Sequence, residues 1–221
     1  MRTPRSMTFG SYHTYADGLW TLTGWELSAA VYKQNLVEIP GSSQLLDLST
    51  SLTGGEPTYS SRTLTATFES SEGDRLARNE RITKMINALD GYLMGIILPD
   101  DPDRYLVGRV SVKKVYNDMA HASVQVTAVC EPWKYAKEET MVSLQATEDE
   151  QEATLMNQGR LGVVPTLVVT GGDVSLVYGA ASWVLSEGTY QLPDLYLTHG
   201  DHHIAFSGAG VLTFNYREAI L

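Results

Sequence analysis

The chain has 221 residues, of which 43% are hydrophobic and 19% charged, and its formal net charge is -10. This composition is typical of a folded acidic protein with one large or two small cores, and it excludes a globally disordered chain. It also argues against specific nucleic-acid binding, because affinity for nucleic acid rests mainly on lysine and arginine side chains.

The amino terminus and the cysteine content restrict the cellular context. Arg2, Pro4 and Arg5 are followed by no apolar segment, and no stretch reaches the roughly 18 apolar residues that a membrane span needs. We therefore expect synthesis in the cytoplasm, no export by the usual signals and no membrane insertion. Cys130 is the single cysteine, which excludes an internal disulfide and a Cys-rich zinc site.

Most of the sequence alternates apolar and polar residues with period two, which predicts a mainly β protein. Early candidate strands cover residues 19–23, 25–32 and 63–68. Residues 40–62 are instead rich in Gly, Ser and Thr and contain Gly54-Gly55. We predict a long projecting loop or loose hairpin there, because a connection of that length is usually mobile or contacts a neighbour.

Residues 74–92 break the alternation and predict the one helix of the chain. Their apolar residues recur at spacings of three and four: Ile82, Met85, Ile86, Leu89 and, just beyond, Leu93. Asp74 is suited to cap the amino end and Gly91 to end the helix. The opposite face is expected to be exposed, and it carries Arg75, Arg78, Arg81 and Lys84.

Further strands are predicted at residues 95–98, 105–116 and 121–130, with Gly108 as a candidate bulge. After Trp133 the chain becomes polar and acidic, which predicts a boundary between a domain of residues 1–136 and one of residues 137–221. In the second domain, glycine-centred turns recur roughly every eight to twelve residues, and this spacing indicates a small β-sandwich.

Two polar clusters invite a chemical interpretation. His199, His202 and His203 could bind a metal, but no other spacing supplies a second shell, so we favour a solvated turn. Asp100, Asp101 and Asp103 could bind calcium or act as acid and base. Aspartates beside prolines more often form turns, because Asp accepts local backbone hydrogen bonds and Pro fixes φ.

The signals of catalysis are missing from the sequence. It contains no Gly-x-Ser-x-Gly elbow and no phosphate-cradling loop, and Cys130 falls on an apolar face where a thiol is inert. We therefore expect no enzyme, no cofactor and no metal site. The aromatic residues of the second half could stack on a sugar, but in a small sandwich we favour core packing for them: Tyr178, Trp183, Tyr190 and Tyr196.

Several segments resemble the distal tail proteins of long-tailed, non-contractile bacteriophages, and together they cover nearly the whole chain. In the first half they are Val37-Glu38-Ile39-Pro40-Gly41-Ser42, Leu46-Asp47-Leu48-Ser49, Leu52-Thr53-Gly54, Tyr59, Arg62-Thr63-Leu64, Arg78, Met85-Ile86-Asn87-Ala88-Leu89-Asp90-Gly91, Leu98-Pro99-Asp100-Asp101-Pro102, Tyr105 and Gly108-Arg109. In the second half they are Cys130-Glu131-Pro132-Trp133-Lys134-Tyr135, Gly188-Thr189-Tyr190, Pro193-Asp194-Leu195, residues 197–200, Gly208-Ala209-Gly210 and Tyr216-Arg217-Glu218.

The resemblance implies a structural hub in the virion tail tip. It implies an amino-terminal, tail-tube-like β-sandwich with one helix and an extended hairpin, followed by a galectin-like β-sandwich. Copies are expected to form a ring, usually a hexamer, through which DNA passes. The expected partners are the tail tube protein, the tail-tip (tail-associated) protein and, in some phages, a receptor-binding protein. Before assembly the chain is expected in the host cytoplasm.

The ring requires an inter-subunit surface, which we place on the loop from Val37 to Arg62 and on edge strands near residues 105–116. The residues expected at this surface are Ile39, Pro40, Leu46, Leu48, Leu52, Tyr59 and Arg62. The negative net charge suggests in addition that carboxylates line the channel, repel DNA and let it slide.

Two other classes of function stay open at this stage. A carbohydrate-binding adhesion module would require an exposed aromatic side chain with polar neighbours in residues 140–221. A hydrolase fused to a tail component would require two convergent carboxylates in a cleft, for which the sequence offers only the turn at Asp100, Asp101 and Asp103.

Overall fold

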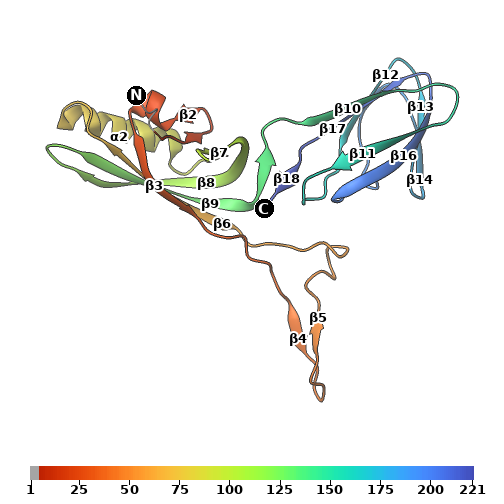
Figure 1. Cartoon of the computed structure of the whole chain (residues 1–221), viewed down its shortest axis with the longest axis horizontal. Helices are drawn as coiled ribbons and strands as arrows, with labels where there is room; N and C mark the ends of the chain where they lie inside the picture. The colour runs from red at the N-terminus through yellow and green to blue at the C-terminus, as the bar shows by residue number, and fades with distance from the viewer. Residues whose placement is uncertain (1–4) are drawn as a thin grey trace. The chain divides into compact units, whose positions relative to one another are not determined.

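The computed structural model describes residues 5–221, so Arg2 and Pro4 of the amino-terminal prediction lie outside the described residues. The chain divides into two compact units, of which the first ends at Lys134 and the second comprises Tyr135–Leu221 (Figure 1). Within the described part of the chain, no helix is long and apolar enough to cross a membrane.

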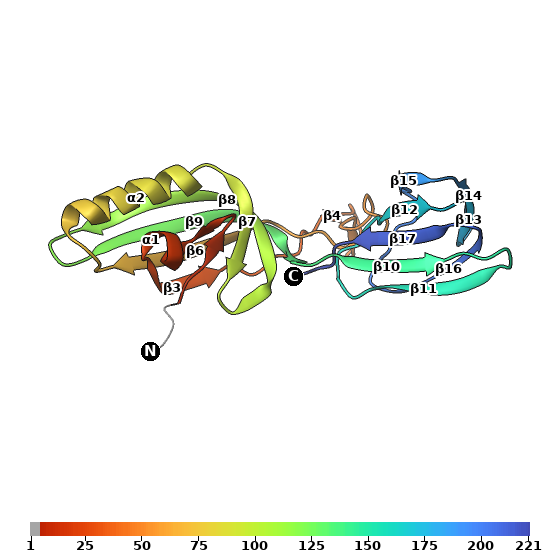
Figure 2. The same cartoon turned by 90° about the horizontal axis from the view of Figure 1, so that it is seen from above.

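The first unit is built on an eight-stranded sheet with a helix on one face (Figure 2). Seven of the strands follow the order β2-β1-β7-β8-β9-β6-β3, and the eighth, β18 (Ala219–Ile220), pairs with β9 off this path. Its elements are β1 (Thr8–Phe9), β2 (Tyr12–His13), α1 (Thr14–Gly18), β3 (Thr21–Leu27), β4 (Leu36–Glu38), β5 (Leu45–Asp47), β6 (Arg62–Ser70), α2 (Arg75–Leu89), β7 (Leu93–Leu98), β8 (Asp101–Asn117) and β9 (Ala122–Ala136). Strands β4 and β5 form a separate pair outside this sheet, and the short helix α1 was not predicted.

Helix α2 confirms the predicted helix and its amino-terminal cap. The carboxylate of Asp74 accepts a hydrogen bond from the backbone N–H of Ala77 at 2.8 Å. The helix ends at Leu89, followed by Asp90 as the C-cap and by Gly91 with φ +82°. Leu93 belongs to β7 and is 60% exposed, so its inclusion in the buried face of the helix was wrong.

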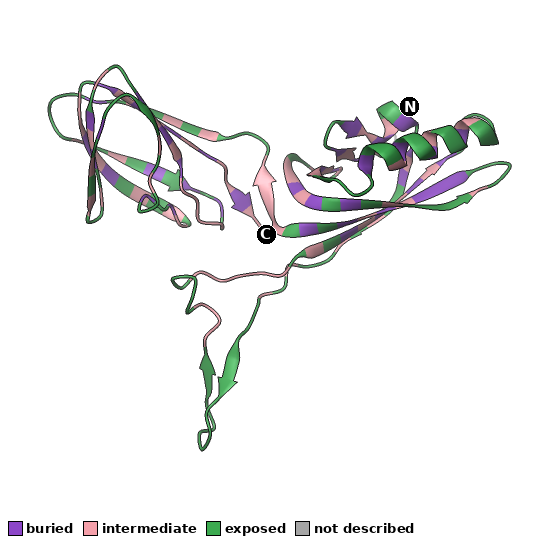
Figure 3. Cartoon of the chain, turned by 180° about the vertical axis from the view of Figure 1, so that it is seen from behind, coloured by how far each residue is buried: buried purple, intermediate pink, exposed green. Residues whose placement is uncertain are grey.

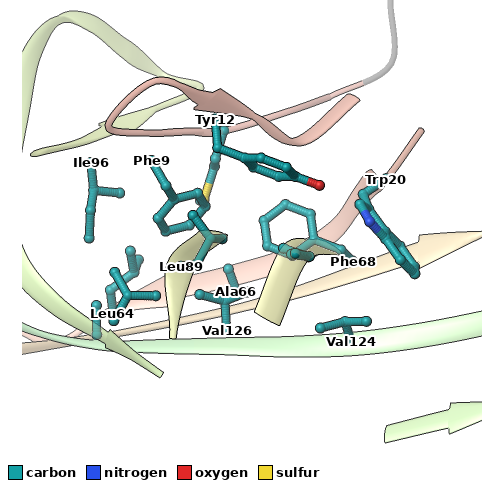
Figure 4. Close-up of a cluster of buried hydrophobic side chains, with 14 of the residues drawn as sticks. Phe9, Tyr12, Trp20, Leu64, Ala66, Phe68, Leu89, Ile96, Val124 and Val126 are labelled. Carbon is teal, nitrogen blue, oxygen red and sulfur yellow. The ribbon is translucent and has the colours of Figure 1, made fainter. Parts of the chain in front are cut away.

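The core of this unit forms where α2 covers the sheet. Strand β6 pairs with β9 so that Leu64 lies opposite Ala128, and two further core pairs follow in the same register, Ala66 with Val126 and Phe68 with Val124. Figure 4 shows these side chains with Leu89 of α2 above them. Burial of each large aliphatic side chain contributes about 1.5–3 kcal/mol, which holds the helix on this face.

Arg78 is buried, whereas the helix pattern predicted it to be exposed. Its side chain is 1% exposed, and its guanidinium donates to the carbonyl oxygens of Gly73, Asp118 and Met119 at 2.5, 2.9 and 3.1 Å. The planar guanidinium carries five N–H donors, so it is stable under the helix where several carbonyl groups meet. Arg78 thereby connects α2 to the turn between β8 and β9.

The second unit contains two four-stranded sheets that share one apolar core. The strands are β10 (Thr140–Gln145), β11 (Gln151–Asn157), β12 (Thr166–Thr170), β13 (Val174–Tyr178), β14 (Ala181–Leu185), β15 (Gly188–Gln191), β16 (Gly200–Gly208), β17 (Val211–Tyr216) and β18 (Ala219–Ile220). One sheet has the order β10-β17-β12-β15 and the other β11-β16-β13-β14. The mainly β class is confirmed, and the galectin-like assignment stays a prediction.

The core of the second unit follows from alternation along these strands. In β12, the buried residues Leu167 and Val169 alternate with half-buried ones. In the other sheet, Leu176 of β13 and Ile204 of β16 are the buried residues of alternating strands. Strand β18 returns the chain to the start of this unit, where the N–H of Ala136 donates to the carbonyl of Glu218 at 2.8 Å.

Gly108 was predicted as a bulge, but β8 is regular there. Gly108 lies opposite Met94, and the irregularity in the pairing of β7 with β8 lies between Ile96 and Leu98. The reason for a glycine is steric, since an added Cβ would lie 2.6 Å from Sγ of Cys130 and 3.2 Å from the carbonyl oxygen of Val129. The absence of a side chain therefore allows β8 and Cys130 to approach each other.

We predict that Gly108→Ala destabilises the first unit by about 1–3 kcal/mol, because the new methyl group overpacks against Cys130. The matched control is Gly24→Ala in β3, where an added Cβ meets no atom within 4 Å and the change should be nearly neutral. Urea unfolding measures both variants. Equal stability of the two variants would contradict the steric role of Gly108.

We also predict that Arg78→Ala lowers the free energy of unfolding by roughly 2–4 kcal/mol, because a buried side chain is truncated and three carbonyl groups lose a charged donor. Arg75→Ala, on the exposed side of the same helix, should change it by less than about 0.5 kcal/mol. Thermal unfolding of the two variants compares them directly. A similar small effect in both would mean that the Arg78 hydrogen bonds contribute little to stability.

Candidate assembly interface

The chain leaves the first sheet after β3, forms a hairpin and returns in β6. We call this segment, residues 31–60, the arm. Strands β4 and β5 pair antiparallel, with Val37 opposite Leu46. Pro40 and Gly41 make the turn between them, because the N–H of Ser42 donates to the carbonyl of Ile39 at 3.0 Å and Gly41 has φ +81°. This is the geometry of a type II turn, for which proline and glycine are the preferred central residues. The predicted hairpin therefore exists, and its first strand begins before residue 40.

Most aliphatic residues of the arm are exposed to solvent, whereas Leu48 is half-buried (Figure 3). The exposed fractions are 45% for Leu36, 41% for Val37, 44% for Ile39, 53% for Leu45, 45% for Leu46 and 98% for Leu52. A two-stranded hairpin has no core of its own and is marginally stable in water. A cluster of exposed aliphatic residues on such an element is typical of a surface that binds another protein.

A second turn follows β5 at residues 48–56 and carries Leu52. The N–H of Ser49 donates to the carboxylate of Asp47 at 2.8 Å, and hydrogen bonds from Ser49 hold the pKa of Asp47 below its usual value. Asp47 is therefore ionised at neutral pH. Gly54 and Gly55, with φ +64° and +95°, supply the left-handed backbone that closes this turn.

The neck of the arm is held against β9 by aromatic rings. Tyr32 bridges to Tyr59, and their rings lie 6.0 Å apart in an edge-to-face arrangement. The ring of Tyr59 in turn meets the ring of Trp133 at 5.5 Å. Two backbone hydrogen bonds of 2.9 Å close the neck, from the N–H of Lys33 to the carbonyl of Thr58 and from that of Ser60 to Val31. The neck thus attaches the arm to the sheet of the first unit, although β4 and β5 pair only with each other.

The residues predicted for the inter-subunit surface fall into two groups. Ile39, Pro40, Leu46, Leu48 and Leu52 lie on the free part of the arm. Tyr59 and Arg62 lie at its root: Tyr59 contacts Trp133, and Nε of Arg62 donates to the carbonyl of Ser28 at 2.7 Å. Their place in an interface between subunits stays a prediction.

Sequence reasoning included Val37 in the segment expected at the interface but missed the neck partners Tyr32 and Trp133. The contact of Tyr59 with Trp133 joins residues far apart in the sequence, so no local pattern could indicate it.

The edge strands expected near residues 105–116 are not at an edge. Strand β8 lies between β7 and β9, and the sheet ends at β2 and β3. Beyond Arg109, where its pairing with β7 ends, the N–H of Val110 donates to the carbonyl of Tyr92 and that of Val112 to the carboxylate of Asp90. The expected edge position was wrong where β8 pairs with β7, because alternation identifies a strand but not the strands beside it. A place of this strand in an interface between subunits stays a prediction.

The three clustered histidines have separate partners: His199 directly precedes β16, whereas His202 and His203 belong to this strand, so the predicted solvated turn was wrong for these two. His202 contacts the hydroxyl of Tyr178 at 2.7 Å and the carbonyl of Thr198 at 2.9 Å. His203 contacts Thr154 across the sheet, and His199 contacts the carbonyl of Gly159. Over residues 5–221, the structure brings no three His, Cys, Asp or Glu side chains together as a metal site would require.

The aspartates around Pro99 bind cations of the same unit. Asp100 forms an ion pair with Arg5 at 2.9 Å, and Asp101 forms ion pairs with Arg104 and Lys134 at 3.4 and 3.2 Å. Pro99 and Asp100 form the turn between β7 and β8, whereas Asp101 and Asp103 belong to β8, so the predicted turn is confirmed for Asp100 alone. The ion pair of Asp101 with Lys134 ties the start of β8 to the end of β9.

Cys130 and the aromatic residues of the second unit serve packing. Burial raises the pKa of the Cys130 thiol to about 11, which makes it unreactive at neutral pH. Tyr178, Trp183 and Tyr190 pack against the core of the second unit, as predicted, whereas Tyr196 is 39% exposed. The ring of Tyr196 lies so close to Gly162 that a Cβ there would overlap it, so this ring covers backbone.

We predict that Trp133→Ala loosens the neck of the arm without unfolding the sheet. An edge-to-face aromatic pair contributes about 0.5–1.5 kcal/mol, so the amides of Lys33 and Ser60 should exchange roughly 2–12 times faster. Hydrogen exchange measures this, with the amides of α2 as the internal control. Unchanged exchange at the neck would show that the two backbone hydrogen bonds alone fix the arm.

Comparison with known proteins identifies a solved structure with the same fold. No protein-family model and no curated protein matches this chain. Among solved structures, the crystal structure of the phage SPP1 Dit (gp 19.1) protein matches with a TM-score of 0.66 and 13% sequence identity, over 97% of this chain and 99% of that one. That protein is called a paradigm of the hub adsorption apparatus in Gram-positive infecting phages. The chain therefore has the fold of SPP1 Dit over nearly its whole length, which confirms the resemblance to the distal tail proteins at the level of the fold.

Proposed function

We propose that the protein is a structural subunit of a phage tail tip, where copies of it form a hub ring between the tail tube and the proteins of the tip. The observation that carries this proposal is the arm, an exposed aliphatic hairpin rooted in a sheet of Dit-like fold. Such an element contributes nothing to the core of its own domain and suits a surface that a neighbouring molecule completes.

A closed ring requires two different surfaces on each subunit, because one patch must meet another on the next copy until the rotation closes. The arm supplies one such surface, and the sheet and helix of the neighbouring first unit supply the other. By analogy with the distal tail family, the ring is a hexamer. The protein is a scaffold and not an enzyme, and this role requires neither a cofactor nor a metal.

The ring has one face toward the tail tube protein and the other toward the tail-tip protein, and the second unit is available to carry a receptor-binding protein. This places the protein in the virion tail tip after assembly in the host cytoplasm. The net charge of -10 favours a channel that repels DNA and lets it pass. A neutral or basic channel in the assembled ring would contradict that part of the proposal.

We predict that the purified protein forms closed rings at high concentration and that removal of the arm abolishes them. The arm is best removed by joining Lys33 to Thr58 through an Asn-Gly turn, because their backbone hydrogen bond already closes the neck. Negative-stain electron microscopy should show rings with a central hole for the full chain and single particles for the shortened one. Its thermal unfolding should stay within a few degrees of the full chain, because the deleted residues 34–57 lie outside both cores.

Rings from the shortened chain would remove the arm from the interface while leaving the hub intact. A full chain that stays monomeric at all concentrations, alone and with tail tube protein added, would contradict the hub itself.

A further inference from the structure

A cleft of about 480 Å³ opens on the first unit between the β1–β2 hairpin and the carboxyl end of α2. A volume of this size is within the range of sites that bind small molecules. Two of the residues that line the cleft, Phe9 and Tyr12, are 1% and 7% exposed and belong to the core of this unit (Figure 4). The core therefore holds one side of the cleft in place.

Tyr92 also lines the cleft, but it is 58% exposed. Its backbone is fixed on both sides, because its N–H donates to the carbonyl of Leu89 at 3.3 Å and its carbonyl accepts from the N–H of Val110 at 3.0 Å. The ring thus presents an aromatic surface to water from a fixed position. The electron-rich face of an aromatic ring attracts C–H groups, such as those on the apolar side of a sugar ring.

Three polar side chains line the same cleft and supply both donors and acceptors of hydrogen bonds: Ser11, Asp17 and Lys84. Oδ2 of Asp17 accepts from the N–H of His13 at 2.7 Å, which orients the carboxylate so that Oδ1 can accept from a ligand. Nζ of Lys84 lies 3.5 Å from the carbonyl oxygen of Asp17, and an ammonium group has three N–H donors. The hydroxyl of Ser11 both donates and accepts.

The charges in the cleft restrict the kind of ligand that fits it. Among the described residues that line the cleft, Asp17 and Lys84 are the charged ones, and their charges are opposite. A phosphate or carboxylate ligand would meet the carboxylate of Asp17, and a cationic ligand would meet the ammonium of Lys84. An uncharged ligand rich in hydroxyl groups satisfies both side chains, because each hydroxyl donates and accepts.

We propose that this cleft binds an uncharged sugar unit of a glycan. The apolar side of the sugar ring packs on Tyr92, and its hydroxyl groups bond to Asp17, Lys84 and Ser11. This inference goes beyond the proposed function, because the site lies within a single subunit and requires neither the arm nor a ring.

Saturation-transfer difference NMR on the purified full chain tests the proposal with three probes: glucose, galactose and N-acetylglucosamine. Tyr92→Ala removes the aromatic ring of the cleft, and Tyr92→Phe keeps it. The matched control is Tyr116→Ala, because Tyr116 is a 38% exposed tyrosine of β8 in the same unit and does not line the cleft. Both tyrosines lie outside the core, so all three variants should fold, which thermal unfolding verifies.

We expect at least one probe to give a saturable signal that Tyr92→Phe and Tyr116→Ala leave unchanged. Tyr92→Ala should weaken binding of that probe at least about fivefold, through loss of the aromatic contact. Asp17→Asn keeps an oxygen for the N–H of His13 but removes the charge, and it should weaken binding roughly threefold. Inorganic phosphate at the concentration of the probe should leave the signal unchanged.

Three results would overturn the proposal. They are the absence of a saturable signal from all three probes, an equal effect of Tyr92→Ala and Tyr116→Ala, and displacement of the sugar by inorganic phosphate, which would identify an anion site. None of these results bears on the hub, because the measurement does not require a ring. A chain that forms no ring would contradict the proposed function and leave the sugar site standing.

Discussion

A two-stranded hairpin cannot bury both of its faces, and this constraint organises the molecule. Each strand pair elsewhere in the chain belongs to a sheet with a helix or a second sheet over it. The strands of the arm, β4 and β5, pair only with each other, and most of their aliphatic side chains are exposed to water. Since exposed aliphatic area of this kind is costly to a monomer, the arm is best understood as part of an interface that only an assembly completes.

The core of the first unit gives this arm a rigid base. In the first unit α2 covers β6 and β9, and the buried guanidinium of Arg78 ties the helix to the turn between β8 and β9. Trp133 of β9 then contacts Tyr59 at the neck. The neck of the arm is therefore connected through β9 to the core that α2 covers, and this connection restricts the orientation of the arm relative to the sheet.

Local patterns in the sequence predicted the elements well and their neighbours poorly. The capping residue Asp74 and the apolar spacing from Ile82 to Leu89 defined α2, because both signals act within a few residues. Arg78 could not be predicted as buried, since its carbonyl partners at Asp118 and Met119 lie some forty positions along the chain. The same limit explains why β8 was expected at an edge.

For the arm, sequence alone indicated a projecting segment and its apolar residues but not their orientation. The separation of Leu46 from Leu45 depends on the pairing of Val37 with Leu46, and a shift of one residue would exchange the faces. The hydrogen bond from the N–H of Leu48 to the carbonyl of Asn35 continues that register toward the neck. The structure was therefore needed to assign each side chain of the arm to one of its two faces.

Hydrogen exchange of the backbone amides of β4 and β5, compared between separated monomers and rings, tests the central claim most directly. If a neighbouring copy completes the arm, these amides exchange quickly in the monomer and at least tenfold more slowly in the ring, while the amides of α2 change little. Equal exchange in both states would mean that the arm is not part of the interface and would contradict the account.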